Sequence, residues 1–374
     1  MFVNIKKRLL SLAVVVAMLI STVPTTALAA EADYTHLVGA TNNIEKPNAG
    51  GALQILDKSG VKTLCDEKGT PIQLRGMSTF GLQWTPGIIN NNAFAALAND
   101  FDSNVIRLAM YVTETGYGTD AASMVANTKY IEDGIRFAQD NDMYVIVDWH
   151  VTTPGDPNAA EYSGAKDFFA KISAEFPNAT NIIYELTNEP SSSSTSTSSG
   201  VTNDAAGWAM VKSYAEPIIK SLRDSGNKNL VIVGNPCWSQ RPDLAADNPV
   251  VDSASNTIYT VHFYTGTHLP SADNSVRDDK NVMDNVRYAL AHGGAVFASE
   301  WGTSESSGNN GPFLDNANAW LDFLNKNNIS WCNWSLTNKN ETSAAFTPFV
   351  MNKTAATDFD PGADQVWAIQ ELSI

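Results

Sequence analysis

The segment Ile182–Pro190 reads IIYELTNEP, an apolar, strand-forming run that ends in the polar residues Asn188 and Glu189. Seven other runs share this character, being short, apolar and rich in β-branched residues. Together with Ile182–Leu186 they make eight: Ile72–Arg75, Asn104–Leu108, Tyr144–Asp148, Leu230–Val233, Thr257–Val261, Val296–Ser299 and Ile329–Asn333. Near-continuous apolar strands of this kind are typical of parallel sheets whose faces are covered by helices.

Segments with helical spacing alternate with these runs. The predicted helices are Thr128–Asp140, Lys166–Phe176, Ala205–Asp224, Val282–His292 and Ala317–Asn327. Eight such units over about 270 residues match a (β/α)8 barrel better than an open doubly wound sheet. Ahead of the first unit, Leu53–Leu56 and Val61–Leu64 flank turn residues, which predicts a β-hairpin at the barrel floor. The predicted fold is therefore α/β, a single (β/α)8 (TIM) barrel domain with a short N-terminal hairpin.

The start of the chain has the layout of a signal peptide. Three positive charges precede the apolar run Leu9–Ile20, which is too short to span a bilayer, and Ala27-Leu28-Ala29 fits the pattern that signal peptidase accepts. We therefore expect residues 1–29 to be a signal peptide and the protein to be secreted. Residues 30–51 are interpreted as a linker or leader, and residues 52–374 as the barrel domain.

Two later segments depart from the barrel pattern. Ser191–Gly200 is almost entirely Ser and Thr, which favours a flexible loop insertion. After Trp334, only Asp364–Leu372 offers material for the helix that should close the barrel. We therefore expect the chain to be truncated at its C-terminus, or to end early.

Composition excludes several classes of partner. The formal net charge is −16, and binding to nucleic acids or acidic membranes needs clustered Lys and Arg. After the leader, no apolar run approaches the roughly 18 residues that a membrane span needs. Cys65, Cys237 and Cys332 are too few and too scattered for a disulfide framework or a metal site, so we expect three core or strand thiols.

Polar residues close six of the eight runs. In a βα barrel the catalytic groups come from the C-terminal ends of the strands, so these residues are the candidates for chemistry. They are Arg107, Asp148-Trp149-His150, Asn188-Glu189-Pro190, His262-Phe263-Tyr264, Glu300-Trp301-Gly302 and Trp334.

Two carboxylates among them, Glu189 and Glu300, end the fourth and seventh strands and should face each other across the barrel mouth. This arrangement suits glycoside hydrolysis, in which one carboxyl group protonates the departing oxygen while the other attacks the anomeric carbon or activates water. Glu185 points the same way but lies roughly 13 Å deeper along the strand. We therefore expect Glu185 to be a buried partner, for example of Arg107, and Asp148 to be structural too.

Five motifs in order resemble the strand-end motifs of glycoside hydrolase family 5, specifically its bacterial endo-β-1,4-glucanases. They are Leu108–Tyr111, Val147–His150, Ile183–Pro190, His262–Tyr264 and Ser299–Gly302. Two more stretches, Arg75–Trp84 and Trp334–Glu341, favour the cellulase branch. Asn235–Leu244 is similar to the same stretch in clostridial members. The resemblance runs from about Ala52 to the C-terminus.

The resemblance implies the catalytic roles. Glu189 would be the acid/base and Glu300 the nucleophile of a retaining endo-β-1,4-glucanase that acts on cellulose or related β-glucans. Arg107 and Tyr264 could hold Glu300 ionised by charge-assisted hydrogen bonds. Asn188 is placed to bind the sugar 2-hydroxyl. The remaining support would come from His150 and His262, which would hydrogen-bond sugar hydroxyls or Glu189.

The substrate-binding residues rest on the same resemblance. Trp84, Trp238 and Trp334 fall in strand-end loops, where indole rings stack against sugars. Tyr111 belongs to the same set, and Lys339 and Glu341 match positions that grip a sugar on the non-reducing side. At Phe80 many family members have a histidine, so we expect a weaker polar grip on the distal sugar.

Other interpretations remain open at this stage. A β-mannanase or xyloglucanase would share the catalytic residues and differ in the shape of the cleft. A non-catalytic carbohydrate-binding barrel is disfavoured because both glutamates, Arg107 and Tyr264 are intact. A metal site is disfavoured because no His-x-His pair ends an early strand. We therefore expect a monomeric enzyme that needs no metal or other cofactor.

Overall fold

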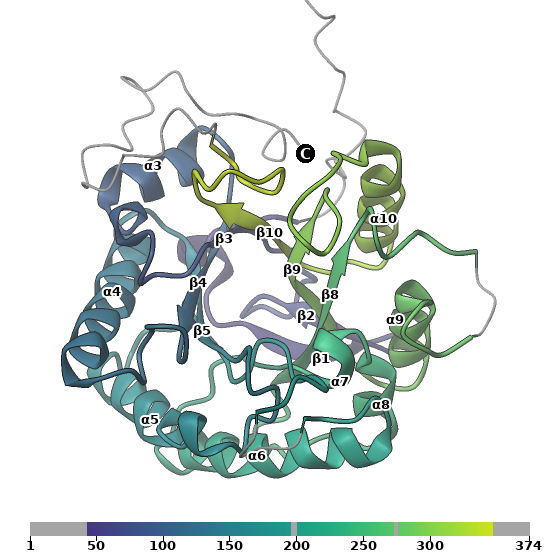
Figure 1. Cartoon of the computed structure of the whole chain (residues 1–374), viewed down its shortest axis with the longest axis horizontal. Helices are drawn as coiled ribbons and strands as arrows, with labels where there is room; N and C mark the ends of the chain where they lie inside the picture. Colours follow the sequence, from purple (N-terminus) through teal and green to yellow (C-terminus); the bar gives the residue numbers. More distant parts are fainter. Residues whose placement is uncertain (1–42, 196–199, 273–275, 347–374) are drawn as a thin grey trace, which may run out of the picture. The chain divides into compact units, whose positions relative to one another are not determined.

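A computed structural model of the chain describes residues 43–195, 200–272 and 276–346, and in it eight parallel strands close into a barrel. Helices line the outside of the ring of strands (Figure 1). The barrel strands are β3 (Arg75–Thr79), β4 (Val105–Tyr111), β5 (Tyr144–His150), β6 (Ile182–Glu185), β7 (Val231–Val233), β8 (Thr257–Tyr264), β9 (Val296–Gly302) and β10 (Trp331–Leu336). They pair in sequence order and β10 pairs with β3, so the predicted (β/α)8 barrel is confirmed.

Each predicted strand overlaps an observed one, but the first overlaps only at Arg75. Ile72 and Leu74 are fully buried in an apolar cluster with Leu53 and Leu64, at the end of the barrel where the strands begin. Their apolar character reflects this floor cluster and not a strand, which is why periodicity misplaced β3.

Several strands continue beyond their predicted ends, β5 to His150, β8 to Tyr264 and β9 to Gly302. The added residues are buried and belong to the ladder, where His150 aligns with Tyr111 and His262 with Glu300. His150, His262 and Glu300 are therefore held within the sheet, whereas Asn188 and Glu189 lie beyond the end of β6.

Five helices correspond to predicted ones: α4 (Ala121–Asp140), α5 (Ala165–Glu175), α6 (Ala205–Asp224), α9 (Val282–Ala291) and α10 (Leu314–Lys326). Helix α6 has the predicted bounds. Helix α4 begins earlier than predicted, after Asp120, whose side chain accepts a hydrogen bond from the Ser123 N–H. The apolar residues of its first turns, Met124 and Val125, are exposed and do not follow the helical spacing of a buried face. Periodicity therefore missed the start of this helix.

Shorter helical segments were not predicted. These are α2 (Pro47–Gly50), η1 (Pro86–Ile88), α3 (Asn91–Asn99), η2 (Ala160–Tyr162), α7 (Pro236–Ser239) and α8 (Pro242–Asp247). Most span only one or two turns, too short for a hydrophobic period to be visible.

The predicted hairpin is present as β1 (Gln54–Lys58) and β2 (Val61–Cys65). Ser59 and Gly60, the two loop residues, have φ values of 58° and 89°, as a tight two-residue turn requires. The Ile55 N–H donates to Asn256 Oδ1, and the hairpin shares the floor cluster with residues near the beginnings of the barrel strands.

Residues 43–51, expected to belong to a linker, are ordered against the barrel. The Gln73 N–H donates to the Asn43 carbonyl, Lys46 Nζ to the Ala98 carbonyl and the Asn48 N–H to Asp142 Oδ1. Residues 43–51 therefore pack with the barrel, although they lie ahead of the boundary that we expected at residue 52.

Several predictions lie outside the described residues: the signal peptide, residues 30–42 of the linker, the helix at 364–372 and the C-terminal truncation. In the Ser/Thr-rich stretch, Ser191 is buried and pairs with Gly155 and Val201 through backbone hydrogen bonds. Within the described ranges, no helix is long and apolar enough to cross a membrane. All three cysteines are buried and unpaired, as expected.

Candidate active site

Arg107 of β4 forms the centre of a buried ionic network at the C-terminal end of the barrel. Its guanidinium lies 2.9 Å from Asp148 Oδ2, 2.7 Å from Glu185 Oε2 and 3.0 Å from Glu300 Oε2. Burial alone would lower the pKa of Arg107, but the three carboxylates raise it well above its usual value. Glu185 is thus a buried partner of Arg107, as the sequence predicted, and Asp148, which we expected to be structural, is a second partner.

Glu300 of β9 is held at both of its oxygens. Arg107 donates to Oε2, and the Tyr264 hydroxyl donates to Oε1 at 2.7 Å. Two donors of this kind fix the position of both carboxyl oxygens. Glu300 is therefore arranged as a fixed carboxylate, with the two partners expected from the sequence.

Glu189 follows β6 and has a different environment. His262 Nδ1 lies 3.0 Å from Glu189 Oε1, and about a quarter of the Glu189 side chain is exposed. Burial raises the pKa of Glu189 to about 8, because the opposing charge of Arg107 is outweighed by desolvation and by the like charges of Asp148 and Glu185. Glu189 is therefore arranged as a proton donor near neutral pH.

The two carboxyl groups are close enough to act on one atom. An oxygen of Glu189, a ring nitrogen of His262 and an oxygen of Glu300 all lie within 4.8 Å of one another. A metal ion bound to these atoms would compete with the Arg107 guanidinium at Glu300 and would break the bond between His262 and Glu189. The donor set therefore suits proton transfer and nucleophilic attack better than metal binding.

Asn188 and His150 lie beside these carboxyl groups. Asn188 Oδ1 accepts from Arg107, and its Nδ2 donates to the Val151 carbonyl at 3.2 Å. His150 Nδ1 lies 2.6 Å from Asp148 Oδ2, and burial lowers the pKa of His150 to about 3, so its ring is neutral. Of the two predicted histidines, only His262 contacts Glu189.

An aromatic wall, formed by Phe80, Trp84, Tyr111 and Trp334, extends from one side of the site. Phe80 stacks on Trp84 at 5.1 Å between ring centroids and lies 5.7 Å from Trp334, and Tyr111 lies 4.9 Å from Trp84. Tyr111, Trp334 and Tyr264 share one buried cluster, which joins the wall to Glu300. Trp84 remains 41 % exposed, so a flat face is available to a ligand.

Lys339 and Glu341 meet the aromatic wall at Phe80. Lys339 Nζ lies 2.7 Å from Glu341 Oε2 and 4.9 Å from the centre of the Phe80 ring. The structure thus brings together Lys339, Glu341 and the wall, as predicted.

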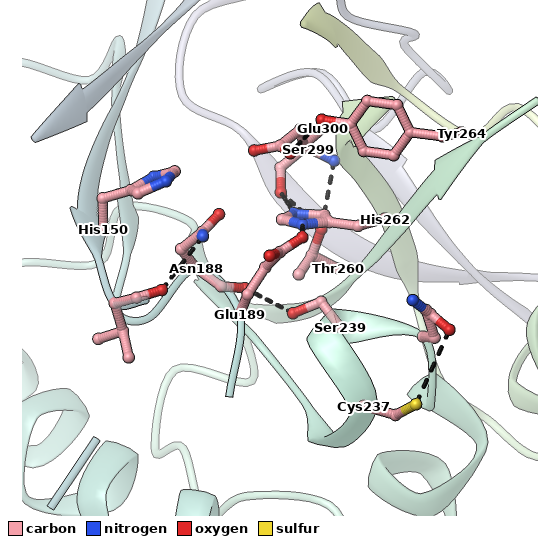
Figure 2. A network of polar contacts seen from close by, with 12 residues as sticks. His150, Asn188, Glu189, Cys237, Ser239, Thr260, His262, Tyr264, Ser299 and Glu300 are labelled. Carbon is pink, nitrogen blue, oxygen red and sulfur yellow. Dashed lines mark hydrogen bonds and ion pairs between the residues drawn. The ribbon is translucent and has the colours of Figure 1, made fainter. Parts of the chain in front are cut away.

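A pocket of about 420 Å³ opens on the other side of Glu189 and Glu300. Trp238 of α7 lines it and is 41 % exposed. Cys237, Trp238 and Ser239 all have φ near +57°, which is unusual for residues other than glycine. The Ser239 hydroxyl donates to the Asn188 carbonyl (Figure 2). The Trp238 N–H donates to the Pro190 carbonyl. This unusual turn therefore fixes Trp238 to the strand end that carries Glu189.

Sequence reasoning missed several residues that line this pocket. They come from the loops after β7, β8 and β9 and are Cys237, Gln240, Thr267, His268, Asp279 and Ser306. Loops carry no periodic pattern that would point to these residues. Among them, only His268 could have been proposed as a site residue, because it follows shortly after a strand end.

Comparisons with known proteins agree with this geometry. The sequence model of the family "Cellulase (glycosyl hydrolase family 5)" matches residues 65–340. An endoglucanase of Halalkalibacter akibai is 54 % identical over 98 % of this chain and 46 % of its own length, so this chain spans less than half of that relative. Cellulase CelDZ1 of a Thermoanaerobacterium species is 55 % identical over 91 % of this chain and 83 % of its own length.

The solved structure of the alkaline cellulase K catalytic domain superposes with a TM-score of 0.79 and 54 % identity. The match covers 87 % of this chain and 91 % of that one. The strand-end motifs, the barrel and these relatives lead to one assignment: the chain belongs to glycosyl hydrolase family 5, the cellulase family.

Proposed function

We propose that this chain is a retaining endo-β-1,4-glucanase that hydrolyses internal bonds of cellulose or related β-glucans. The observation that carries the proposal is the pairing of two carboxyl groups within 4.8 Å of each other in opposite electrostatic settings. Glu300 is held by Arg107 and Tyr264, while burial favours the protonated form of Glu189. This spacing is that of retaining enzymes, since inverting enzymes need carboxyl groups roughly 6.5–9.5 Å apart to admit a water molecule.

In the first step, the Glu189 carboxyl group transfers its proton to the glycosidic oxygen while a Glu300 oxygen attacks the anomeric carbon. The bond between that carbon and the glycosidic oxygen breaks, and the leaving chain departs with a new hydroxyl group. In the second step, the Glu189 carboxylate removes a proton from water, whose oxygen attacks the anomeric carbon and releases the Glu300 carboxylate.

The surrounding residues supply binding and support. Arg107 and Tyr264 orient Glu300, and His262 orients Glu189. Asn188, fixed by Arg107, lies where it can bind the sugar 2-hydroxyl with its second amide hydrogen, a contact that strengthens in the oxocarbenium-like transition state. His150, neutral and held by Asp148, lies beside the same sugar position.

The aromatic wall and Trp238 extend the site in both directions. Indole and phenol rings provide faces for pyranose stacking on either side of the cleaved bond. Lys339 and Glu341 add charged hydrogen-bonding groups beyond the wall, on the non-reducing side. A long polymer bound across both sides would be cut internally.

A reducing-sugar assay tests this proposal across carboxymethyl cellulose, barley β-glucan, xyloglucan, mannan and xylan. We expect release from the first two, together with a rapid fall in the viscosity of carboxymethyl cellulose. Faster release of reducing sugar from mannan or xyloglucan than from the two glucans would instead identify the protein as a β-mannanase or a xyloglucanase. Release from none of the five would contradict an enzymatic role and favour a carbohydrate-binding barrel.

We also propose that the protein is secreted as a monomer after cleavage behind Ala29. The proposal rests on the charged and apolar leader and on the polymeric substrate, which a cell cannot import intact. N-terminal sequencing of the protein from culture medium, followed by light scattering, tests both statements. Retention of the leader, or a dimeric mass, would contradict them.

A further inference from the structure

A buried hydroxyl group beneath the site contacts three polar side chains. Ser299 Oγ lies 2.7 Å from Glu185 Oε1, 2.5 Å from Thr260 Oγ1 and 3.0 Å from His262 Nε2. All four residues are buried. Figure 2 shows the His262 ring between Ser299 on one side and Glu189 on the other.

The single hydrogen of the Ser299 hydroxyl decides how these contacts are arranged. Arg107 donates two N–H groups to the Glu185 carboxylate, so both Glu185 oxygens act as acceptors. Ser299 must therefore donate to Glu185, and its oxygen accepts from its other two neighbours. Thr260 Oγ1 already accepts from the Ser299 N–H, which leaves its own hydrogen for Ser299 Oγ. The remaining neighbour, His262, must then carry a hydrogen on Nε2.

A hydrogen on Nε2 determines what the other ring nitrogen of His262 can do. Burial lowers the pKa of His262 to about 4, so the ring is neutral and holds a single N–H. Nδ1 is then an acceptor, 3.0 Å from Glu189 Oε1. An ionised Glu189 would place two lone pairs face to face at this distance, whereas a protonated Glu189 donates a hydrogen bond.

We propose that Ser299 is a positioning residue that holds His262 in its Nε2–H tautomer and thereby keeps the proton on Glu189. The inference rests on the proposed function of Glu189 as the general acid. Neither Ser299 nor Glu185 touches the reacting atoms. They act through the His262 ring. The hydrogen bond at Nε2 fixes the tautomer, and the tautomer makes Nδ1 an acceptor for the proton of Glu189.

Other charged groups face the same pair from the neighbouring strands and must be included in any pH argument. Those that act on Glu189 or His262 are Arg107 from β4, Asp148 and His150 from β5, Glu185 from β6 and Glu300 from β9. Substitution of Ser299 by an uncharged residue leaves these charges in place. A change in the proton affinity of Glu189 would therefore report the loss of the hydrogen bond that Ser299 accepts from His262.

The substitutions Ser299→Val and Ser299→Thr form a matched pair of nearly equal shape. Threonine keeps the hydroxyl group, whereas valine places a methyl group against Nε2 and fills the space that a water molecule could occupy. In Ser299→Val, we expect His262 to move its hydrogen to Nδ1 and donate it to Glu189. Because a hydrogen bond to the charged form stabilises that form, the alkaline limb of kcat/KM on an aryl cellobioside should move to lower pH by about one unit. Ser299→Thr should keep the wild-type limb.

Nitrogen NMR of histidine-labelled protein reads the tautomer directly, since the chain has only five histidines and His262→Gln identifies the signal. We expect the Nε2–H pattern in wild type and Ser299→Thr, and the Nδ1–H pattern in Ser299→Val. A Nδ1–H pattern in the wild type, or an unmoved alkaline limb in folded Ser299→Val, would overturn the proposal. If Ser299→Val does not fold, the alkaline limb of Ser299→Ala and the tautomer seen in the wild-type spectrum test the proposal instead. If the wild type cleaves no glucan, the proposed function fails, while the spectrum still tests the hydrogen-bond assignment.

Discussion

The guanidinium of Arg107 pairs with both the candidate nucleophile, Glu300, and a carboxylate of the barrel interior, Glu185. It lies 3.0 Å from Glu300 Oε2 and 2.7 Å from Glu185 Oε2. With Asp148 also at 2.9 Å, one buried cation faces three carboxylates. A buried ion pair is costly to break, since the charge that remains has neither water nor a partner. Arg107 therefore supports stability and catalysis together.

Arg107→Met should lower the free energy of unfolding by about 3–5 kcal/mol and abolish activity, because it leaves three buried carboxylates without their cation. Urea denaturation measures the first effect. Arg136→Met is the matched control, since Arg136 pairs with Glu175 at the surface and both are nearly half exposed. That substitution should cost no more than about 1 kcal/mol. Equal losses in the two variants would contradict the role given to Arg107.

Glu189→Gln and Glu300→Gln should fail in different ways. Glu300→Gln removes the nucleophile, so turnover should vanish on all substrates while oligosaccharides still bind. Glu189→Gln removes the proton donor, so it should retain cleavage of aryl cellobiosides whose leaving group needs no proton, particularly with azide as the second nucleophile. Burst kinetics and calorimetry separate the two. If Glu189→Gln is inactive even on such a substrate with azide, its assignment as acid/base is wrong.

The anomeric configuration of the first product tests the spacing of the two carboxyl groups. With oxygens of Glu189 and Glu300 within 4.8 Å, no water fits between carboxylate and sugar, so double displacement should retain the β configuration. Proton NMR during the first minutes of hydrolysis should show the β anomer before mutarotation. Initial release of the α anomer would mean that Glu300 activates water and does not attack carbon.

The sequence predicted the barrel because its strands are buried on both faces and carry a continuous apolar signal. It misplaced β3 because Ile72 and Leu74 are equally apolar but belong to the floor. The position of a residue at a strand end was enough to bring Glu189 and Glu300 together, since the closed barrel converges these ends on one site. Arg107 lies four residues before the end of β4 and reaches Glu300 through its long side chain.

Other features of the site depend on contacts that no linear pattern encodes. Gln240 and Asp279 reach the pocket from irregular loops. The left-handed turn at Trp238 depends on hydrogen bonds that Ser239 and Trp238 donate to the carbonyls of Asn188 and Pro190, which are distant in the sequence. Ser299 reads as an ordinary strand residue until its neighbours across the barrel are known. Side-chain packing between strands, and not periodicity, determines these relationships.

Asp252 should make stability depend on pH in the acid range. Its carboxylate binds Arg223 at 2.8 and 2.9 Å and accepts from the backbone of Ala254 and Asn256. Although burial opposes the charge, these bonds hold the pKa of Asp252 at about 2, below the usual 3.8. A lowered pKa in the folded state adds stability above about pH 4 that disappears as the pH falls toward 2.

Asp252→Asn should therefore lower the free energy of unfolding by about 2 kcal/mol at pH 7 and by much less near pH 2. Urea denaturation at several pH values measures the difference. Asp224→Asn, which removes an exposed ion pair with Lys220, is the control and should change little at any pH. A constant loss from pH 7 to pH 2 would show that Asp252 acts through its shape and not through its charge.

Lys339 should contribute to binding more than to chemistry. Its ammonium group lies between Glu341 and the Phe80 ring, and neither contact involves Glu189 or Glu300. A group that contacts the substrate away from the cleaved bond does so equally in the ground state and in the transition state. Its loss therefore raises KM and leaves kcat almost unchanged. Because Phe80 offers a ring face but no polar group, the ammonium carries more of the polar contact there. Lys339→Ala should raise KM for short cello-oligosaccharides about tenfold, the equivalent of one charged hydrogen bond. Lys220→Ala, at an exposed position on α6, is the control, and an unchanged KM in Lys339→Ala would exclude Lys339 from the binding site.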